Sequence, residues 1–268
     1  MSDITSLFQR VWKNIWKEKI LWLFSGLYFI SQITLIFSPT QKELGLLLLC
    51  LLLFGFLITI YLSYAGSIGV TYIASRIIVG NSVNIQMVFQ AIGNFFWRVV
   101  ASILLFSLFV VVCLGLFFIL FIKKLPQFSE LPLIIFIVSI LSSFFIAPGY
   151  FIFSEIIVSD SGIGKSLENA WNLFIDNFVV LAAIGFILSS IFHIANVTIG
   201  ALIILFQHNF DFSALSKFSF FMPQLSLLDN KLYNLHNFLV LAVFGTVWNT
   251  FSRSIFMLAY LKYRGQIE

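Results

Sequence analysis

Three charged residues stand within or at the edge of long apolar segments, each in a similar string. Charged side chains in hydrocarbon are costly, so they usually face a helix-bundle interior and pair with one another. If the three helices are equivalent, the strings predict a buried Arg–Glu–Arg cluster of Arg76, Glu155 and Arg253. The strings are Ser75-Arg76-Ile77-Ile78-Val79, Ser154-Glu155-Ile156-Ile157-Val158 and Ser252-Arg253-Ser254-Ile255-Phe256.

An alternative is that each charge extends separately to the lipid headgroups along its own helix. Taken alone, Arg76 and Glu155 fit this alternative better than the cluster. Arg253 fits it less well, because a mostly apolar stretch separates it from Tyr260 and Lys262.

A second group of polar residues interrupts two other apolar segments. His193 and Asn196 lie in one of them, and Asn249 lies midway along the next. Intramembrane polar residues are candidate functional sites, but they also form ordinary hydrogen bonds between helices. Interhelical hydrogen bonding is the favoured interpretation for the asparagines. His193 lacks a second ligand, so no metal site is expected.

Catalytic motifs are absent from the sequence. Gly162-Ile163-Gly164-Lys165-Ser166 resembles the end of a phosphate-binding loop, but the position of its first glycine holds Ser159 and no strand precedes it. We find no zinc-protease or nucleophile-elbow motif. The sequence therefore predicts no catalytic residue, no metal and no cofactor, and an intramembrane enzyme is an unsupported alternative.

The elements that must position these residues follow from composition. The chain is 60% hydrophobic and 10% charged, with a mean hydropathy of +1.05, whereas soluble domains are roughly 25% charged. Lysines and arginines are scattered among segment ends instead of forming a basic patch with stacking aromatics, which argues against nucleic-acid binding. These features predict an all-α integral membrane protein surrounded by lipids.

Six apolar segments are long enough to cross a bilayer, which takes about 20 helical residues. Three amphipathic segments with the helical period, at 4–16, 85–97 and 163–175, are expected to lie in the membrane interface. The expected spans are 20–38, 44–66, 97–122, 132–154, 178–206 and 237–260.

The layout predicts one transmembrane domain, 1–268, built from three pseudo-repeats at 1–80, 81–160 and 161–268. Each repeat would be an interfacial helix followed by a helical hairpin, as Phe8-Gln9 and Trp16 recur at Phe89-Gln90 and Trp97. Internal repeats are common in transport folds. The alternative is that any hairpin-built membrane protein places interfacial helices before its spans.

Orientation follows from the positive-inside rule. With both termini cytoplasmic, ten of the fifteen Lys and Arg residues lie on or near the cytoplasmic side. The opposite side then holds Lys42, Lys123, Lys124, Lys217 and Lys231.

The segment Ser166-Leu167-Glu168-Asn169-Ala170-Trp171-Asn172-Leu173-Phe174-Ile175-Asp176-Asn177-Phe178 follows a glycine-containing turn and the acidic Glu155. In this it resembles uncharacterised prokaryotic six-span membrane proteins similar to the membrane domain of bacterial glycerophosphodiester phosphodiesterases. The resemblance implies a stand-alone membrane domain in the inner membrane of a prokaryotic cell. The phosphodiesterase domain itself is absent, so no catalytic residue carries over.

Two functions agree with this architecture. The first is a non-enzymatic membrane module that supports assembly or binds a protein partner or a second copy. The second is a transporter or channel for a small or lipidic solute, with a hydrated cavity lined by His193, Asn249 and Arg253.

Overall fold

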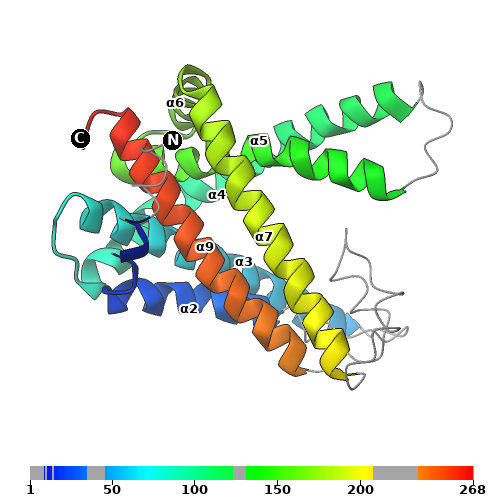
Figure 1. The fold of residues 1–268 in the computed structure, drawn as a ribbon. Coiled ribbons are helices and arrows are strands. Elements are labelled where there is room, and N and C mark those ends of the chain that lie inside the picture. Colours follow the sequence, from blue (N-terminus) through cyan, green and yellow to red (C-terminus); the bar gives the residue numbers. More distant parts are fainter. Residues whose placement is uncertain are drawn as a thin grey trace. The chain divides into compact units, whose positions relative to one another are not determined.

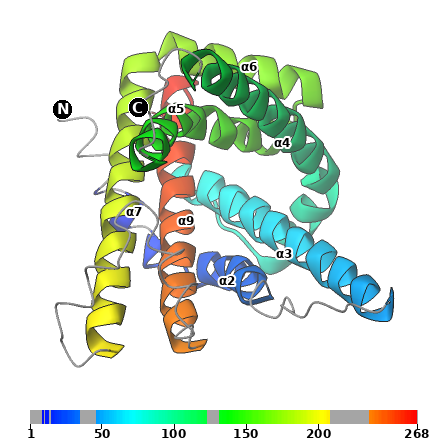
Figure 2. The same cartoon turned by 90° about the vertical axis from the view of Figure 1, so that its right-hand side faces the viewer.

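The computed structural model describes residues 9, 11–13, 15–34, 46–122, 131–207 and 235–267, and within these ranges all regular structure is helical. The all-α prediction is confirmed for this part of the chain. Figures 1 and 2 show the helices α2 (Lys19–Thr34), α3 (Leu46–Ile78), α4 (Ile85–Ile122), α5 (Leu131–Val158), α6 (Ile163–Asp176), α7 (Phe178–Gln207) and α9 (Leu235–Tyr263).

Two stretches of the described helices are long and apolar enough to cross a membrane, Phe54–Ile78 in α3 and Ile85–Cys113 in α4. A third is obtained if Ile163–Asp176 and Phe178–Phe192 are one broken span. Each of the six predicted spans falls on a helix, but length and composition single out only these two or three within the described ranges.

The chain divides into two compact units. The first contains Met1–Leu104, Pro148–Asn177 and Ala242–Glu268, and the second contains Leu105–Ala147 and Phe178–Leu241. The buried core of the first unit includes the carboxyl-terminal halves of α3, α5 and α9, which carry large side chains such as Ile73, Phe151 and Tyr260. The three predicted charged residues therefore all belong to the first unit.

Helix α2 packs along α3 in the first unit, as Figures 1 and 2 show. The approach is close because α3 carries glycine at two positions facing Phe24. A Cβ atom added at Gly66 would lie 2.8 Å from the Phe24 carbonyl oxygen, and one at Gly69 would lie 2.7 Å from the Phe24 ring. Small residues allow such close helix contacts in membrane proteins.

The helix that contains the second predicted span, 44–66, is longer than that span at its carboxyl end. Helix α3 continues to Ile78, and its second half carries serine and threonine that the apolar-segment criterion excluded. These hydroxyls bond to carbonyls of their own helix, with Thr71 Oγ1 donating to the Ser67 carbonyl at 2.8 Å and Ser75 Oγ to the Tyr72 carbonyl at 2.7 Å. A satisfied hydroxyl can be buried at low cost.

Of two predicted interfacial segments, one is a separate helix in the structure and the other is not. Residues 85–97 are not a separate helix, because α4 runs unbroken from Ile85 to Ile122. It begins after Asn84, whose side-chain oxygen accepts a hydrogen bond from the Met87 backbone at 2.8 Å and so caps the helix. Residues 163–176 do form a separate helix, α6, which ends at the C-cap Asn177. The segment 4–16 lies largely outside the described residues.

Helices α3 and α9 end in the same way. After α3, the Asn81 backbone donates to the Arg76 carbonyl at 2.9 Å while Gly80 has a φ of +86°. After α9, the Gln266 backbone donates to the Leu261 carbonyl at 2.9 Å while Gly265 has a φ of +69°. This is the Schellman termination, in which glycine supplies the left-handed residue. At the end of α5 the residue with positive φ is Asp160, at +50°.

Candidate functional site

Glu155 is the centre of the polar contacts in the first unit. It lies near the end of α5, and its side chain is 0% exposed. Its Oε1 atom forms an ion pair with the Arg264 guanidinium from the turn after α9. Its Oε2 atom accepts hydrogen bonds from Asn169 Nδ2 at 3.1 Å and from Ser161 Oγ at 3.3 Å. One buried carboxylate thus joins α5, α6 and the end of α9.

This arrangement satisfies the condition for burying a charge. A buried ion is tolerated when it is paired and its remaining lone pairs are hydrogen-bonded. Both carboxylate oxygens of Glu155 are engaged by donors, so the group acts as a structural clasp. We call Glu155, Ser161, Asn169 and Arg264 the carboxylate clasp.

The cation that pairs with Glu155 is not one of the two arginines of the predicted cluster. Within the described ranges, neither Arg76 nor Arg253 is within ion-pair distance of Glu155, whose cation is Arg264. The helix ends explain the difference. Arg76 and Glu155 lie four and five residues before the positive-φ residue that ends their helices, whereas Arg253 lies twelve residues before Gly265. Matching the strings by residue type therefore placed Arg253 about two turns too deep to reach Glu155.

A second ion pair fixes the turn between α5 and α6. Arg98 Nη2 lies 2.7 Å from Asp160 Oδ1, and Arg98 Nη1 donates to the carbonyls of Asp160 and Ser161, each at 3.3 Å. The Asp160 side chain is 76% exposed, so the pair itself contributes ~1 kcal/mol or less. Its role is to hold the left-handed turn that carries Ser161 to Glu155.

Arg76 stands apart from the carboxylate clasp. It is half-buried, and its guanidinium lies 5.4 Å from the centre of the Tyr72 ring on its own helix. This position at the end of α3 agrees with the alternative in which Arg76 extends independently to the headgroups.

Arg253 has aromatic neighbours instead of an acid. Its guanidinium carbon lies 4.3 Å from the centre of the Phe153 ring and 5.1 Å from that of Tyr150, both on α5. Its Nε atom donates to Asn249 Oδ1 at 3.1 Å, one turn earlier on α9. These neighbours of the cation thus come from α5 and from its own helix, α9.

Three buried polar atoms at this place have no hydrogen-bond partner among the described residues. Two are the N–H donors Arg253 Nη1 and Asn249 Nδ2, and the third is Ser252 Oγ. A cation–π contact contributes about 0.5–2 kcal/mol, while an arginine near the centre of a membrane helix costs at least ~2.5 kcal/mol. The rings therefore offset part of that cost but leave the buried N–H groups without an acceptor.

The predicted polar site is placed only in part. His193 and Asn196 lie on α7 in the second unit, and their side chains are outside the described residues. Asn249 lies on the part of α9 that belongs to the first unit. The grouping of these three residues stays a prediction, while the structure pairs Asn249 with Arg253.

Hydroxyl groups join helices elsewhere in the first unit. Ser25 on α2 and Thr250 on α9 are both buried and 2.6 Å apart, and Ser102 on α4 lies 3.3 Å from Ser166 on α6. Thr250 thus forms an interhelical contact, whereas the hydrogen bond of the neighbouring Asn249 is with Arg253 on the same helix. Ser25 and Ser102 were not singled out, since one serine in an apolar segment carries no distinguishing signal.

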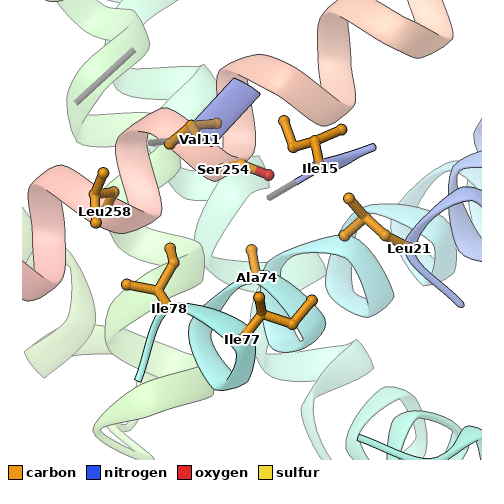
Figure 3. Close-up of a pocket in the computed structure, with 8 residues that line it drawn as sticks. All are labelled: Val11, Ile15, Leu21, Ala74, Ile77, Ile78, Ser254 and Leu258. Carbon is orange, nitrogen blue, oxygen red and sulfur yellow. The ribbon is translucent and has the colours of Figure 1, made fainter. Parts of the chain in front are cut away.

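A small apolar pocket lies at the level of the helix ends, with a volume of about 330 Å³ including its open mouth. It is not lined by His193, Asn249 or Arg253, so it is not the cavity expected for a transporter. Figure 3 shows its lining residues, Val11, Ile15, Leu21, Ala74, Ile77, Ile78, Ser254 and Leu258.

Comparison with protein-family models, with curated proteins and with solved structures gave no match. The resemblance to six-span prokaryotic membrane domains therefore stays a prediction. The functional argument rests on the chain's own residues.

Proposed function

We propose that the chain is a multi-pass protein of a prokaryotic cell membrane that works as a non-enzymatic module, binding another membrane protein or a second copy of itself. The observation that carries this proposal is the contrast between α4 and α3. Only 17% of the candidate span in α4 is buried, against 50% of that in α3. Helix α4 therefore presents an extended apolar surface beyond the contacts that hold it.

Helix α4 is nevertheless firmly held at its beginning. Val88, Ile92 and Val99 are buried, Arg98 binds the turn before α6, and Ser102 contacts Ser166. Beyond this anchored part, the side chains of Leu104, Leu108 and Val111 are exposed. A rigid helix with one anchored end and one open apolar end is suited to packing against another helix in the membrane.

The polar residues support a non-enzymatic role. The buried carboxylate of Glu155 is committed to Arg264, Asn169 and Ser161, so it is not free to exchange a proton with a substrate. The same contacts join α5, α6 and α9, which stabilises the scaffold that positions α4.

The full proposal includes six spans, three repeats and cytoplasmic termini. Helix α6 agrees with an interfacial position: Ala170 and Phe174 face the protein, while Trp171 and Ile175 are exposed. Its predicted polar face is divided, since Asn169 turns inward to Glu155 while Lys165 and Glu168 are exposed. Such a helix can contact protein, lipid and water at once.

A photoreactive amino acid at position 108 tests the partner surface. Leu57 on α3 is the matched control, because its exposure of 62% nearly equals the 63% of Leu108. We expect position 108 to yield one protein adduct of defined mass in native membranes and position 57 to yield lipid adducts. An adduct of twice the chain mass identifies a second copy, and lipid adducts alone at position 108 refute the proposal.

Cysteine labelling tests the topology in a chain whose Cys50 and Cys113 are replaced by alanine. Single cysteines beside Lys13 and Lys262 should react from the cytoplasmic side only. Cysteines beside Lys124 and Lys217 lie outside the described residues and should react from the opposite side. Cytoplasmic reaction beside Lys217 would exclude the six-span arrangement.

Transport of a small or lipidic solute is the second candidate function. It is favoured by one observation, the cation of Arg253 held within a membrane helix without an acidic partner among the described residues.

A further inference from the structure

We propose that Arg253 and Asn249 form a binding site for an oxyanion within the membrane-embedded part of the first unit. The inference goes beyond the proposed function and does not depend on the exposed surface of α4. It starts from two N–H donors among the three buried polar atoms without a partner in the described residues, Arg253 Nη1 and Asn249 Nδ2, with Ser252 Oγ as the third.

The two donors belong to one rigid arrangement. Asn249 and Arg253 are one turn apart on α9, and the hydrogen bond from Arg253 Nε to Asn249 Oδ1 fixes the guanidinium against the amide. With Oδ1 occupied, the free part of the amide is its N–H₂ group. The pair therefore presents donors of hydrogen bonds and one positive charge, which is the complement of a carboxylate or phosphate.

The chain does not supply that anion from its described part. The buried carboxylate of Glu155 is bound to Arg264, and that of Asp160 is bound to Arg98. Glu18 precedes α2, Glu168 lies on the exposed side of α6, Asp176 ends α6, and none of the three makes an ion pair with Arg253. An anion that neutralises Arg253 must then come from outside these residues.

The surroundings further favour an anion. The rings of Phe153 and Tyr150 lie 4.3 and 5.1 Å from the guanidinium carbon. A phenol hydroxyl such as that of Tyr150 can donate a hydrogen bond to an oxyanion. Arg253 as a whole is half-buried, whereas its Nη1 atom is fully buried.

In a membrane, an oxyanion can be the phosphodiester of a lipid or a free anion such as phosphate. Both have the same recognition chemistry, and a titration distinguishes them. The full chain in a nonionic detergent is titrated with phosphatidylglycerol, with inorganic phosphate and with phosphatidylcholine of the same acyl chains. Native mass spectrometry measures the bound lipid, and thermal unfolding measures stabilisation by either anion.

Three variants assign the binding to this site. Arg253→Lys keeps the charge but loses the forked donor, and Asn249→Leu removes the amide. Arg76→Gln is the matched control, because it removes an arginine that also lies near an aromatic ring. The Arg76 guanidinium carbon is 5.4 Å from the centre of the Tyr72 ring, and Arg76 is not part of the proposed site. We expect Arg253→Lys and Asn249→Leu to weaken anion binding by about 10- to 100-fold, and Arg76→Gln to leave it within about twofold.

Each outcome decides the proposal. Binding of phosphatidylglycerol alone assigns a lipid phosphodiester, and binding of inorganic phosphate as well assigns a free anion. If neither anion binds, if both site variants bind like the unmodified chain, or if Arg76→Gln is equally damaging, the site is refuted. If Arg253→Lys does not fold, Asn249→Leu alone gives the answer, since it retains the cation.

Discussion

Two arginines on or just after α9 lie in contrasting surroundings. Arg264 follows the last turn, where its guanidinium is 34% exposed and binds the fully buried Glu155. Arg253 lies three turns earlier, between aromatic rings, without a carboxylate partner in the described part of the chain. One arginine therefore completes an ion pair, while the other has a buried N–H group without an acceptor. The difference follows from position along the chain, because Glu155 lies near the end of α5, within reach of Arg264 but not of Arg253.

The largest effect is expected from Arg264→Met, which removes the cation of the carboxylate clasp. Glu155 would remain 0% exposed without its ion pair, and an unpaired buried charge typically costs at least ~3 kcal/mol. We expect a clearly lower unfolding temperature in detergent, with loss of the contact between the end of α9 and Glu155 on α5. Unfolding within about 1 kcal/mol of the unmodified chain would show that the clasp is no structural element.

A smaller loss is expected from Glu155→Gln. The amide can keep its contacts with Asn169 and Ser161, and the released Arg264 can turn to water. The loss is then that of a charge-assisted hydrogen bond, about 1.5–2 kcal/mol. Glu168→Gln on the exposed side of α6 is the control and should change the unfolding free energy by less than ~0.5 kcal/mol. Equal effects of the two substitutions would contradict the clasp.

The clasp also shows what sequence reasoning could and could not reach. Burial of Glu155 was expected only as part of the charge cluster, because taken alone its position favoured separate extension to the headgroups. The apolar segment 178–206 was predicted as a helix, and α7 extends over Phe178–Gln207. The pairing of Glu155 with Arg264 was not predicted. Arg264 lies beyond the predicted span 237–260 and was counted only as evidence for the orientation of the chain. Glycine at 80 and 265 was the available signal, since aligning helix ends on these residues separates Arg253 from Arg76 and Glu155.

The predicted bounds of α3 and α4 differ from the observed helices for a related reason. Apolar runs predicted that α3 stops at 66 and that α4 starts a new element at 97. Serine and threonine in α3 bond to their own helix backbone, and nothing between 85 and 122 interrupts the backbone hydrogen bonds of α4. Hydropathy reports which residues tolerate lipid, whereas helix continuity depends on breakers and caps.

Arg253→Met tests the second arginine of the comparison by removing its charge. Replacing an incompletely satisfied buried cation by an apolar side chain of similar length is often neutral or stabilising. Loss of the two ring contacts works against this gain, so we expect the unfolding free energy to change by no more than ~1 kcal/mol. Thermal unfolding without added anion measures it. A loss as large as that of Arg264→Met would mean that Arg253 is a structural residue like Arg264.

The smallest effect is expected at the second ion pair, Arg98 with Asp160. Asp160→Asn keeps a residue type that tolerates the left-handed backbone at φ +50°, and it keeps a side-chain oxygen for the Arg98 contact. It removes only the charge of a 76% exposed carboxylate, which is worth ~0.2–1 kcal/mol and falls with added salt. Unfolding of both chains at low and high ionic strength measures this difference. We expect the difference to vanish at high salt, because water and ions already screen this pair. A difference that persists would mean that the turn between α5 and α6 depends on the charge itself. The exposed pair of Arg98 with Asp160 would then stabilise the protein in the same way as the buried pair of Arg264 with Glu155, only less strongly.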